Sequence, residues 1–309
     1  MRREETRREA EGGKGRQAEG ETTVRGNYYL RLTPDPLRSL PLTPDASGPR
    51  GVAEGCEDIL GYPIAMAGRD ACIERILCWL DSREVGRYFV CANPHSLEVA
   101  RIDSLFADAL KNADLIVPDG IGIVIASRLL GGDIRERVTG SDIFLGLSEA
   151  LNRKGSASYF FLGSTEANLH RIKEKMAREL PNIKYAGAHS PPFKPEFGEE
   201  DNRLMVDAIN RATPDVLWVG LTAPKQEKWI YQNRGRLDVK FIGAIGAVFD
   251  FYTGNVKRSH PIFQRMGLEW LPRFLREPRR LWRRNLISNP IFLVRVLRAR
   301  RKRAGPKSY

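Results

Sequence analysis

The sequence predicts an α/β fold in which a parallel sheet is flanked by helices and followed by a basic helical C-terminal appendage. Between residues 55 and 255, short apolar runs of strand length alternate with segments of helical period, and no internal repeat is visible. Strands that alternate with helices of about 10–15 residues are typical of βαβ units, whose strands run parallel. Positive charge is concentrated after residue 256, which distinguishes the appendage from the body.

Five apolar runs are expected to form strands, and four of the segments around them are expected to form helices. The strands are expected at 87–93, 114–120, 156–164, 214–221 and 240–251. The helices are expected at 96–113, 121–132, 141–155 and 165–181. The last two strands are almost continuously apolar, which is typical of strands buried inside a parallel sheet.

The two ends of the chain differ from this body. Residues 1–54 mix charges, glycine and proline with few large apolar groups, so the segment is predicted to be a disordered extension. Residues 256–309 carry sixteen lysines and arginines against only Glu269 and Glu277, while the rest of the chain is slightly acidic. A tail of this kind favours a polyanionic partner, namely phosphate, nucleic acid or an anionic lipid surface.

Composition and missing motifs exclude several classes of site. The four cysteines form no CxxC pair and the four histidines are scattered, so neither a disulfide framework nor a zinc site is expected. The cysteines are expected to be reduced thiols in the cytosol. There is no DxD pair for a metal-bound diphosphate and no GxxxxGK[ST] loop. No run of about 18 apolar residues is present, so any membrane contact is expected at the surface.

Polar residues at the predicted strand ends are the candidate site. Ligands of parallel sheets bind at the carboxyl ends of strands. These ends are at Asn93, Asp119, Gly163, the loop after Leu221, and Asp250. Asp119 suits a general base and equally an N-cap of the following helix. Asn93, which precedes a proline, suits a ligand contact or a simple turn.

Two further segments leave alternatives open. Lys225, Gln226 and Glu227 directly follow a buried strand, as expected for a binding loop, and a solvated helix start would explain Lys225 and Glu227 nearly as well. After Pro278, a residue suited to the first turn of a helix, arginines are interleaved with large apolar residues. This mixture suits a helix at a membrane interface, a nucleic-acid patch, or a basic helix packed on the body.

Six runs of the chain resemble a known family. They are ANPHSLEVAR, ADLIVPDGIGIV, RVTGSD, VGLTAPKQEKWI, AIGAVFDFYTGNVKR and GLEWLPRFLREPRRLWRR. Over residues 58–297 they are similar, in order and spacing, to the WecG/TagA/CpsF glycosyltransferases (glycosyltransferase family 26). The resemblance implies a Rossmann-like catalytic domain at 55–255, inversion at the anomeric carbon, no metal and no cofactor.

The resemblance also implies a substrate class and a location. Members transfer a sugar, often N-acetylmannosamine or its uronic acid, from a UDP donor to a polyprenyl-diphosphate-linked sugar. The products are cell-surface polymers such as teichoic acid linkage units, enterobacterial common antigen and exopolysaccharides. The appendage at 256–309 is therefore expected to meet the inner face of the cell membrane, with the enzyme cytoplasmic and peripheral and without a nucleic-acid partner.

Matching the motifs residue by residue assigns roles to particular side chains. Asp119 of PDG matches the proposed general base, and Asn93 matches a strand-end asparagine that contacts sugar or acceptor. The resemblance assigns donor or acceptor binding to Cys91, Lys225, Gln226, Arg273, Arg280 and Arg283. Of these, the three arginines match appendage residues expected to close over the donor diphosphate, where guanidinium groups stabilise the charge of the leaving UDP.

The chain departs from the family pattern at several positions near this site. Cys91 stands where threonine is common, and a thiol is a weaker hydrogen-bonding group than a hydroxyl. Thr222 and Ala247 stand where glycine is usual, and residues 188–193 replace a histidine–glycine–aromatic turn. These changes make a catalytically inactive nucleotide-sugar-binding protein one alternative function. A nucleic-acid-binding protein that uses the basic tail is another.

Overall fold

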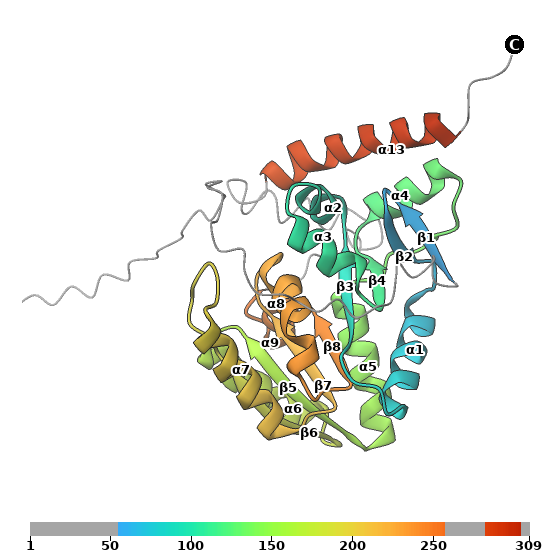
Figure 1. The fold of residues 1–309 in the computed structure, drawn as a ribbon. Coiled ribbons are helices and arrows are strands. Elements are labelled where there is room, and N and C mark those ends of the chain that lie inside the picture. The colour runs from blue at the N-terminus through green and yellow to red at the C-terminus, as the bar shows by residue number, and fades with distance from the viewer. Residues whose placement is uncertain (1–54, 257–281, 304–309) are drawn as a thin grey trace, which may run out of the picture. The chain divides into compact units, whose positions relative to one another are not determined.

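The computed structural model of the protein describes residues 55–256 and 282–303 (Figure 1). The predicted N-terminal extension at 1–54 lies outside the described residues. So do Arg273, Arg280 and the predicted helix start at Pro278. Arg283 lies in the described backbone.

A six-stranded sheet forms the centre of the body, with strand order β4-β3-β8-β7-β5-β6 (Figure 1). Every neighbouring pair in it is parallel, which confirms the predicted α/β class. The strands are β3 (Arg87–Ala92), β4 (Leu115–Pro118), β5 (Ala157–Gly163), β6 (Ile183–His189), β7 (Val216–Gly220) and β8 (Phe241–Ala244). A separate antiparallel hairpin, β1 (Cys56–Ile59) and β2 (Tyr62–Ala65), was not predicted.

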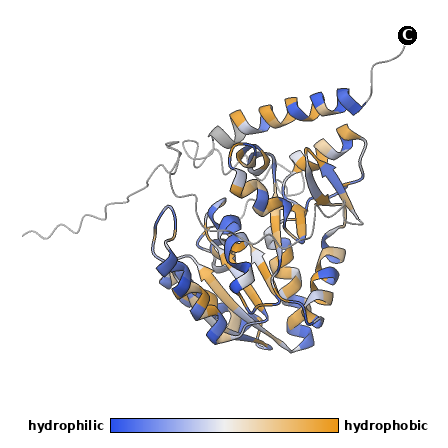
Figure 2. Cartoon of the chain, viewed as in Figure 1, coloured by the Kyte–Doolittle hydropathy of each residue, from blue (hydrophilic) through white to orange (hydrophobic). Residues whose placement is uncertain are grey.

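Helices cover both faces of the sheet, as the two apolar cores show. One face carries α2 (Pro94–Ala100), α3 (Ser104–Lys111), α4 (Ile121–Leu130), α7 (Glu199–Ala212), α8 (Lys225–Asn233) and the C-terminal α13 (Asn289–Arg303). The other face carries α1 (Arg69–Asp81), α5 (Gly140–Lys154), α6 (Glu166–Glu179) and α9 (Val248–Thr253). Figure 2 shows the hydrophobic residues concentrated along the strands and on the helix sides that face them.

Two predicted elements are wrong in their extent. The expected strand at 240–251 ends at Ala244, and α9 begins at Val248, because Val248, Phe249 and Tyr252 bury one helical face. Asp250 therefore lies on a helix and not at a strand end. The expected helix at 96–113 is two helices, because Asp103 caps a new one by accepting a hydrogen bond from the Phe106 amide at 3.0 Å.

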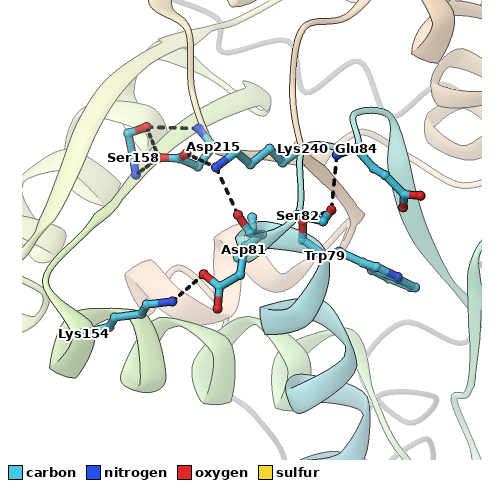
Figure 3. Close-up of polar contacts among 9 residues, drawn as sticks. Trp79, Asp81, Ser82, Glu84, Lys154, Ser158, Asp215 and Lys240 are labelled. Atoms are coloured by element: carbon cyan, nitrogen blue, oxygen red, sulfur yellow. Dashed lines mark hydrogen bonds and ion pairs between the residues drawn. The ribbon is translucent and has the colours of Figure 1, made fainter.

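Polar side chains at the amino edge of the sheet bond to one another (Figure 3). The Asp215 carboxylate accepts hydrogen bonds from the Ser158 amide and hydroxyl at 3.0 and 2.8 Å. Lys240 donates to the Leu80 carbonyl at 3.0 Å and lies 3.5 Å from Asp215. These bonds join β5, β7, the start of β8 and α1, so this edge has a structural role.

Helix α13 packs against the body through only part of its surface. Phe292 and Val296 are buried in the same core as α2 and α4. Arg295 donates to Glu98 of α2 at 2.7 Å. Figure 2 shows hydrophobic and hydrophilic residues alternating along the helix. Among the described helices, none has the length and apolar character needed to cross a bilayer.

Candidate active site

Asp119 and Asn93 meet at the carboxyl edge of the sheet, as predicted. They directly follow the neighbouring strands β4 and β3, in which Pro118 pairs with Ala92. The Asp119 amide donates to the Ala92 carbonyl at 2.8 Å, which fixes its backbone beside Asn93. Both side chains are half-buried, so each is reachable from solvent.

The capping alternative for Asp119 is wrong. The N-cap residue of α4 is Gly120, which has no side chain with which to cap. Gly120 has φ +117°, a conformation that residues with a side chain rarely adopt. The glycine thus sets the turn between β4 and α4 and leaves Asp119 two residues before Ile121, where the helix begins.

Asn93 has a capping role of its own. Its side-chain oxygen accepts a hydrogen bond from the Ser96 amide at 3.0 Å, and the Ser96 hydroxyl bonds back to the Asn93 backbone. This capping box begins α2, with Pro94 in its first turn. The Asn93 Nδ2 atom takes no part in this box, so a ligand could accept a hydrogen bond from it without breaking the cap.

Cys91 lies under this pair and faces the start of α5. A methyl group placed at Gly140 would lie 3.5 Å from the Cys91 Sγ atom. Burial raises the pKa of the Cys91 thiol well above its usual value, and the nearby carboxylates of Asp119 and Glu227 raise it further. The thiol therefore stays protonated and is not a nucleophile.

The start of α5 belongs to the same edge. The Val138 amide donates to the Pro118 carbonyl at 3.0 Å, which brings the RVTGSD segment beside the end of β4. Thr139 and Asp142 form a capping box, in which the Asp142 carboxylate accepts from the Thr139 amide at 2.9 Å. The threonine–x–x–aspartate spacing is the sequence signal for this box.

Gln226 and Glu227 are buried at the start of α8, with exposed fractions of 5% and 3%. The solvated helix start is thus wrong for Glu227. The Gln226 Nε2 atom donates to the Glu227 Oε1 atom at 2.8 Å. The Gln226 amide lies against Gly246, which follows β8. Burial raises the pKa of Glu227 from 4.5 to about 7.

Lys225 points in another direction. Its ammonium group donates to the Lys194 carbonyl at 2.7 Å and lies 4.2 Å from the centre of the Phe197 ring. Burial lowers the pKa of this ammonium group. The described structure thus directs Lys225 to the segment between β6 and α7, not toward Asp119.

A second polar cluster lies at the end of β5. Gly163 and Ser164 both have positive φ, at +112° and +65°. The buried Asn168 side chain donates to the Ser164 hydroxyl at 2.8 Å and to the Asp250 carboxylate at 3.1 Å. One asparagine of α6 therefore bonds both to Asp250 and to Ser164, the residue after the predicted strand end at Gly163.

The described part of the C-terminal segment also reaches this edge. Arg283 begins a six-residue π-helix, η2 (Arg283–Ser288), at whose end Ser288 lies. The Ser288 hydroxyl is 2.8 Å from the His95 Nδ1 atom, two residues after Asn93. The departures Thr222 and Ala247 are both exposed on the loops after β7 and β8.

Comparison with known proteins shows the family of this chain. Residues 57–306 match the Glycosyl transferase WecG/TagA/CpsF family. The chain belongs to this family. It is therefore a glycosyltransferase, and the carboxyl edge that holds Asp119 and Asn93 is its candidate active site.

The similarity to individual family members extends over most of this chain and most of each relative. A Bacillus spizizenii protein named N-acetylglucosaminyldiphosphoundecaprenol N-acetyl-beta-D-mannosaminyltransferase is 34% identical over 228 residues, which are 74% of this chain and 85% of that protein. A Bacillus subtilis protein of the same name is 33% identical over 70% of this chain and 81% of its own length. One from Staphylococcus aureus is 27% identical over 79% of this chain and 93% of its own.

Proposed function

We propose that the protein transfers one sugar, N-acetylmannosamine or a related hexose or uronic acid, from a UDP-sugar to a polyprenyl-diphosphate-linked sugar. The observation that carries this proposal is the pairing of Asp119 and Asn93 at the carboxyl edge of a family glycosyltransferase. The names of the relatives, which specify N-acetylglucosaminyldiphosphoundecaprenol as the acceptor, support the acceptor class. Such a reaction belongs to cell-wall or exopolysaccharide biosynthesis.

In this mechanism Asp119 acts as the general base. The acceptor hydroxyl oxygen forms a bond to the anomeric carbon while the bond from that carbon to the diphosphate oxygen breaks. UDP leaves with the electron pair, and the hydroxyl proton moves to the Asp119 carboxylate. A single displacement of this kind inverts the anomeric configuration. We assign the orientation of the reacting sugars to Asn93, Gln226 and Cys91, and Lys225 stays a proposed ligand contact.

The charge that grows on the leaving UDP requires fixed donors, because we propose that no metal takes part. We assign this role to Arg273, Arg280 and Arg283. Guanidinium groups bind phosphate in a bidentate manner and stabilise developing charge. The bond between Ser288 and His95 supports the assignment for Arg283, since it holds the end of η2 beside the start of α2.

We further propose that the C-terminal segment holds the enzyme at the inner surface of the cell membrane. Several apolar side chains of η2 and α13 are more than a third exposed, although Phe292 and Val296 of the same segment are buried. They are Leu286, Ile287, Ile291, Leu293, Val294 and Leu297. Arginines on the same helix suit the anionic headgroups above such apolar contacts.

The substrate assignment is tested with a panel of UDP-sugars and an acceptor that carries N-acetylglucosamine on a short-chain lipid diphosphate. Transfer from UDP-N-acetylmannosamine is expected to add one sugar to the acceptor, measured by mass spectrometry. Transfer from another UDP-sugar would contradict the proposed donor sugar and still support transfer to a lipid-diphosphate-linked acceptor. Donor binding without transfer from any sugar would instead support the inactive binding protein.

The membrane assignment is tested with the double variant Leu293→Ser/Leu297→Ser. Losing two apolar contacts is expected to weaken sedimentation with phosphatidylglycerol vesicles by about tenfold or more. The matched control is Val85→Ser/Ile102→Ser, which removes two exposed apolar side chains from the body. Tighter, salt-sensitive binding to single-stranded RNA than to vesicles would favour the nucleic-acid alternative.

A further inference from the structure

Glu227 is a carboxylate buried at the carboxyl edge of the sheet, only 3% exposed. One of its oxygens, Oε2, has no hydrogen-bond partner within the described part of the chain. A buried carboxylate with incomplete hydrogen bonding destabilises a fold. An apolar side chain or a glutamine would serve the fold better at this position, so stability alone does not explain Glu227.

The other oxygen of Glu227 orients its neighbour. An ionised carboxylate can only accept hydrogen bonds, so the Gln226 amide must turn its Nε2 atom toward Glu227, where the bond is 2.8 Å long. The amide oxygen, Oε1, then points away from Glu227. Like Glu227 Oε2, it is buried without a partner among the residues that the structure describes.

The position of this oxygen relates it to the reaction. Gln226 follows the loop after β7 and lies against Gly246 in the loop after β8. β8 is the neighbour of β3, which ends at Asn93, and β3 is the neighbour of β4, which leads to Asp119. Four adjacent strands thus bring the oriented amide and the proposed base to one edge.

We propose that Glu227 is a positioning residue for sugar transfer. Its carboxylate fixes the Gln226 amide so that the amide oxygen accepts a hydrogen bond from a hydroxyl or an acetamido N–H group of a bound sugar. The inference rests on the proposed function and goes beyond it, because it gives a buried residue that does not touch substrate a role in the reaction.

The charged groups around Glu227 make this role depend on its ionisation. The Cys91 thiol on β3 is close enough to interact with Glu227. The carboxylates of Asp119 and Asp142 also raise the pKa of this thiol, so they belong to the same group of charges. On the outer side of α8, Lys228 is paired with Asp103 of α3 at 3.1 Å. The O–H group of a protonated Glu227 could donate a hydrogen bond to the Gln226 Oε1 atom once the amide has turned around, so only the ionised form holds the proposed orientation.

A double-mutant cycle tests the proposal through kcat/KM for the sugar transfer that the wild-type chain performs. Glu227→Gln lets the Gln226 amide take either orientation and is expected to lower kcat/KM by about tenfold. In a Gln226→Ala background the same substitution is expected to change kcat/KM by less than about twofold, because the residue it positions is gone. Losses that simply add in the double variant would overturn the proposal.

Two further measurements separate positioning from general loss of structure. Asn233→Ala removes another buried polar side chain from α8, one that bonds to the Trp229 carbonyl of the same helix and to Arg236 just after it, and is expected to leave kcat/KM unchanged. In the wild type, kcat/KM is expected to rise with pH around neutrality, and Glu227→Gln is expected to flatten this rise. An identical pH profile in the two proteins would contradict the role of the carboxylate.

The same series separates this inference from the proposed function. If the wild type transfers sugar and the cycle is additive, only the role of Glu227 fails. If the wild type transfers no sugar, the proposed function fails and the inference fails with it. Glu227→Met keeps the side-chain volume without hydrogen bonding and is expected to lose activity at least as far as Glu227→Gln.

Discussion

Replacing Asp119 with asparagine is expected to lower kcat for sugar transfer by a factor of about 10²–10⁴, the usual contribution of a general base. Asparagine has the same shape as aspartate but cannot take the proton of the acceptor hydroxyl. The backbone bond from residue 119 to the Ala92 carbonyl does not depend on the side chain. The variant is therefore expected to fold and to bind the UDP-sugar. Kinetics with the lipid-linked acceptor and calorimetric donor binding measure both.

Asp133→Asn is the matched control for this variant. Asp133 is an exposed aspartate in the loop after α4, where, within the described ranges, its side chain pairs with the exposed Arg135. The control is expected to keep full kcat. Full turnover by Asp119→Asn would contradict its role as base. A loss of turnover together with a loss of thermal stability would instead indicate a structural role.

The sheet could be predicted from the sequence because the buried strands of a parallel sheet consist of nearly continuous apolar runs. Each of the five expected strands contains an observed one. β3, β4, β5 and β7 could be found in this way because they are formed almost entirely by apolar residues. β6 was missed because its sequence, IKYAGAH, is only partly buried at the edge of the sheet. The end of β8 was missed because Val248, Phe249 and Tyr252 are as apolar as the strand before them.

The site could be predicted where it depends on chain order and not where it depends on packing. Asp119 and Asn93 end neighbouring parallel strands, so the strand-end rule finds both. Glu227 looks like a solvated residue in the sequence, because acidic residues are common in the first turn of a helix. Its neighbours come from segments distant in sequence, such as β3, where Cys91 lies close enough to interact with it. No local pattern contains that information.

Burial of Glu227 makes the stability of the fold depend on pH. The pKa is about 7 in the folded protein, above its ordinary value of 4.5. Below pH 4.5 both states are protonated and ionisation of Glu227 has no cost. Between pH 4.5 and 7 the unfolded chain loses the proton while the folded chain keeps it, so the free energy of unfolding falls as pH rises. Above pH 7 the cost is complete at about 3 kcal/mol.

Glu227→Gln removes this ionisation and is expected to stabilise the protein. At pH 8 its free energy of unfolding should exceed that of the wild type, and the gain should be about 2 kcal/mol larger than at pH 5. Denaturant unfolding at the two pH values measures the difference. The control Glu149→Gln removes an exposed carboxylate paired with Arg153 and should show no such dependence. A wild type as stable at pH 8 as the variant would contradict the buried charge.

The same substitution is thus expected to act in opposite directions on stability and on activity. A glutamate kept only for the fold would show the reverse, because its removal would lower stability and leave kcat/KM unchanged. Residues that destabilise the folded state while they serve the reaction are characteristic of active sites. A more stable and less active Glu227→Gln variant would therefore show that the buried carboxylate destabilises the fold and is retained because it orients the Gln226 amide.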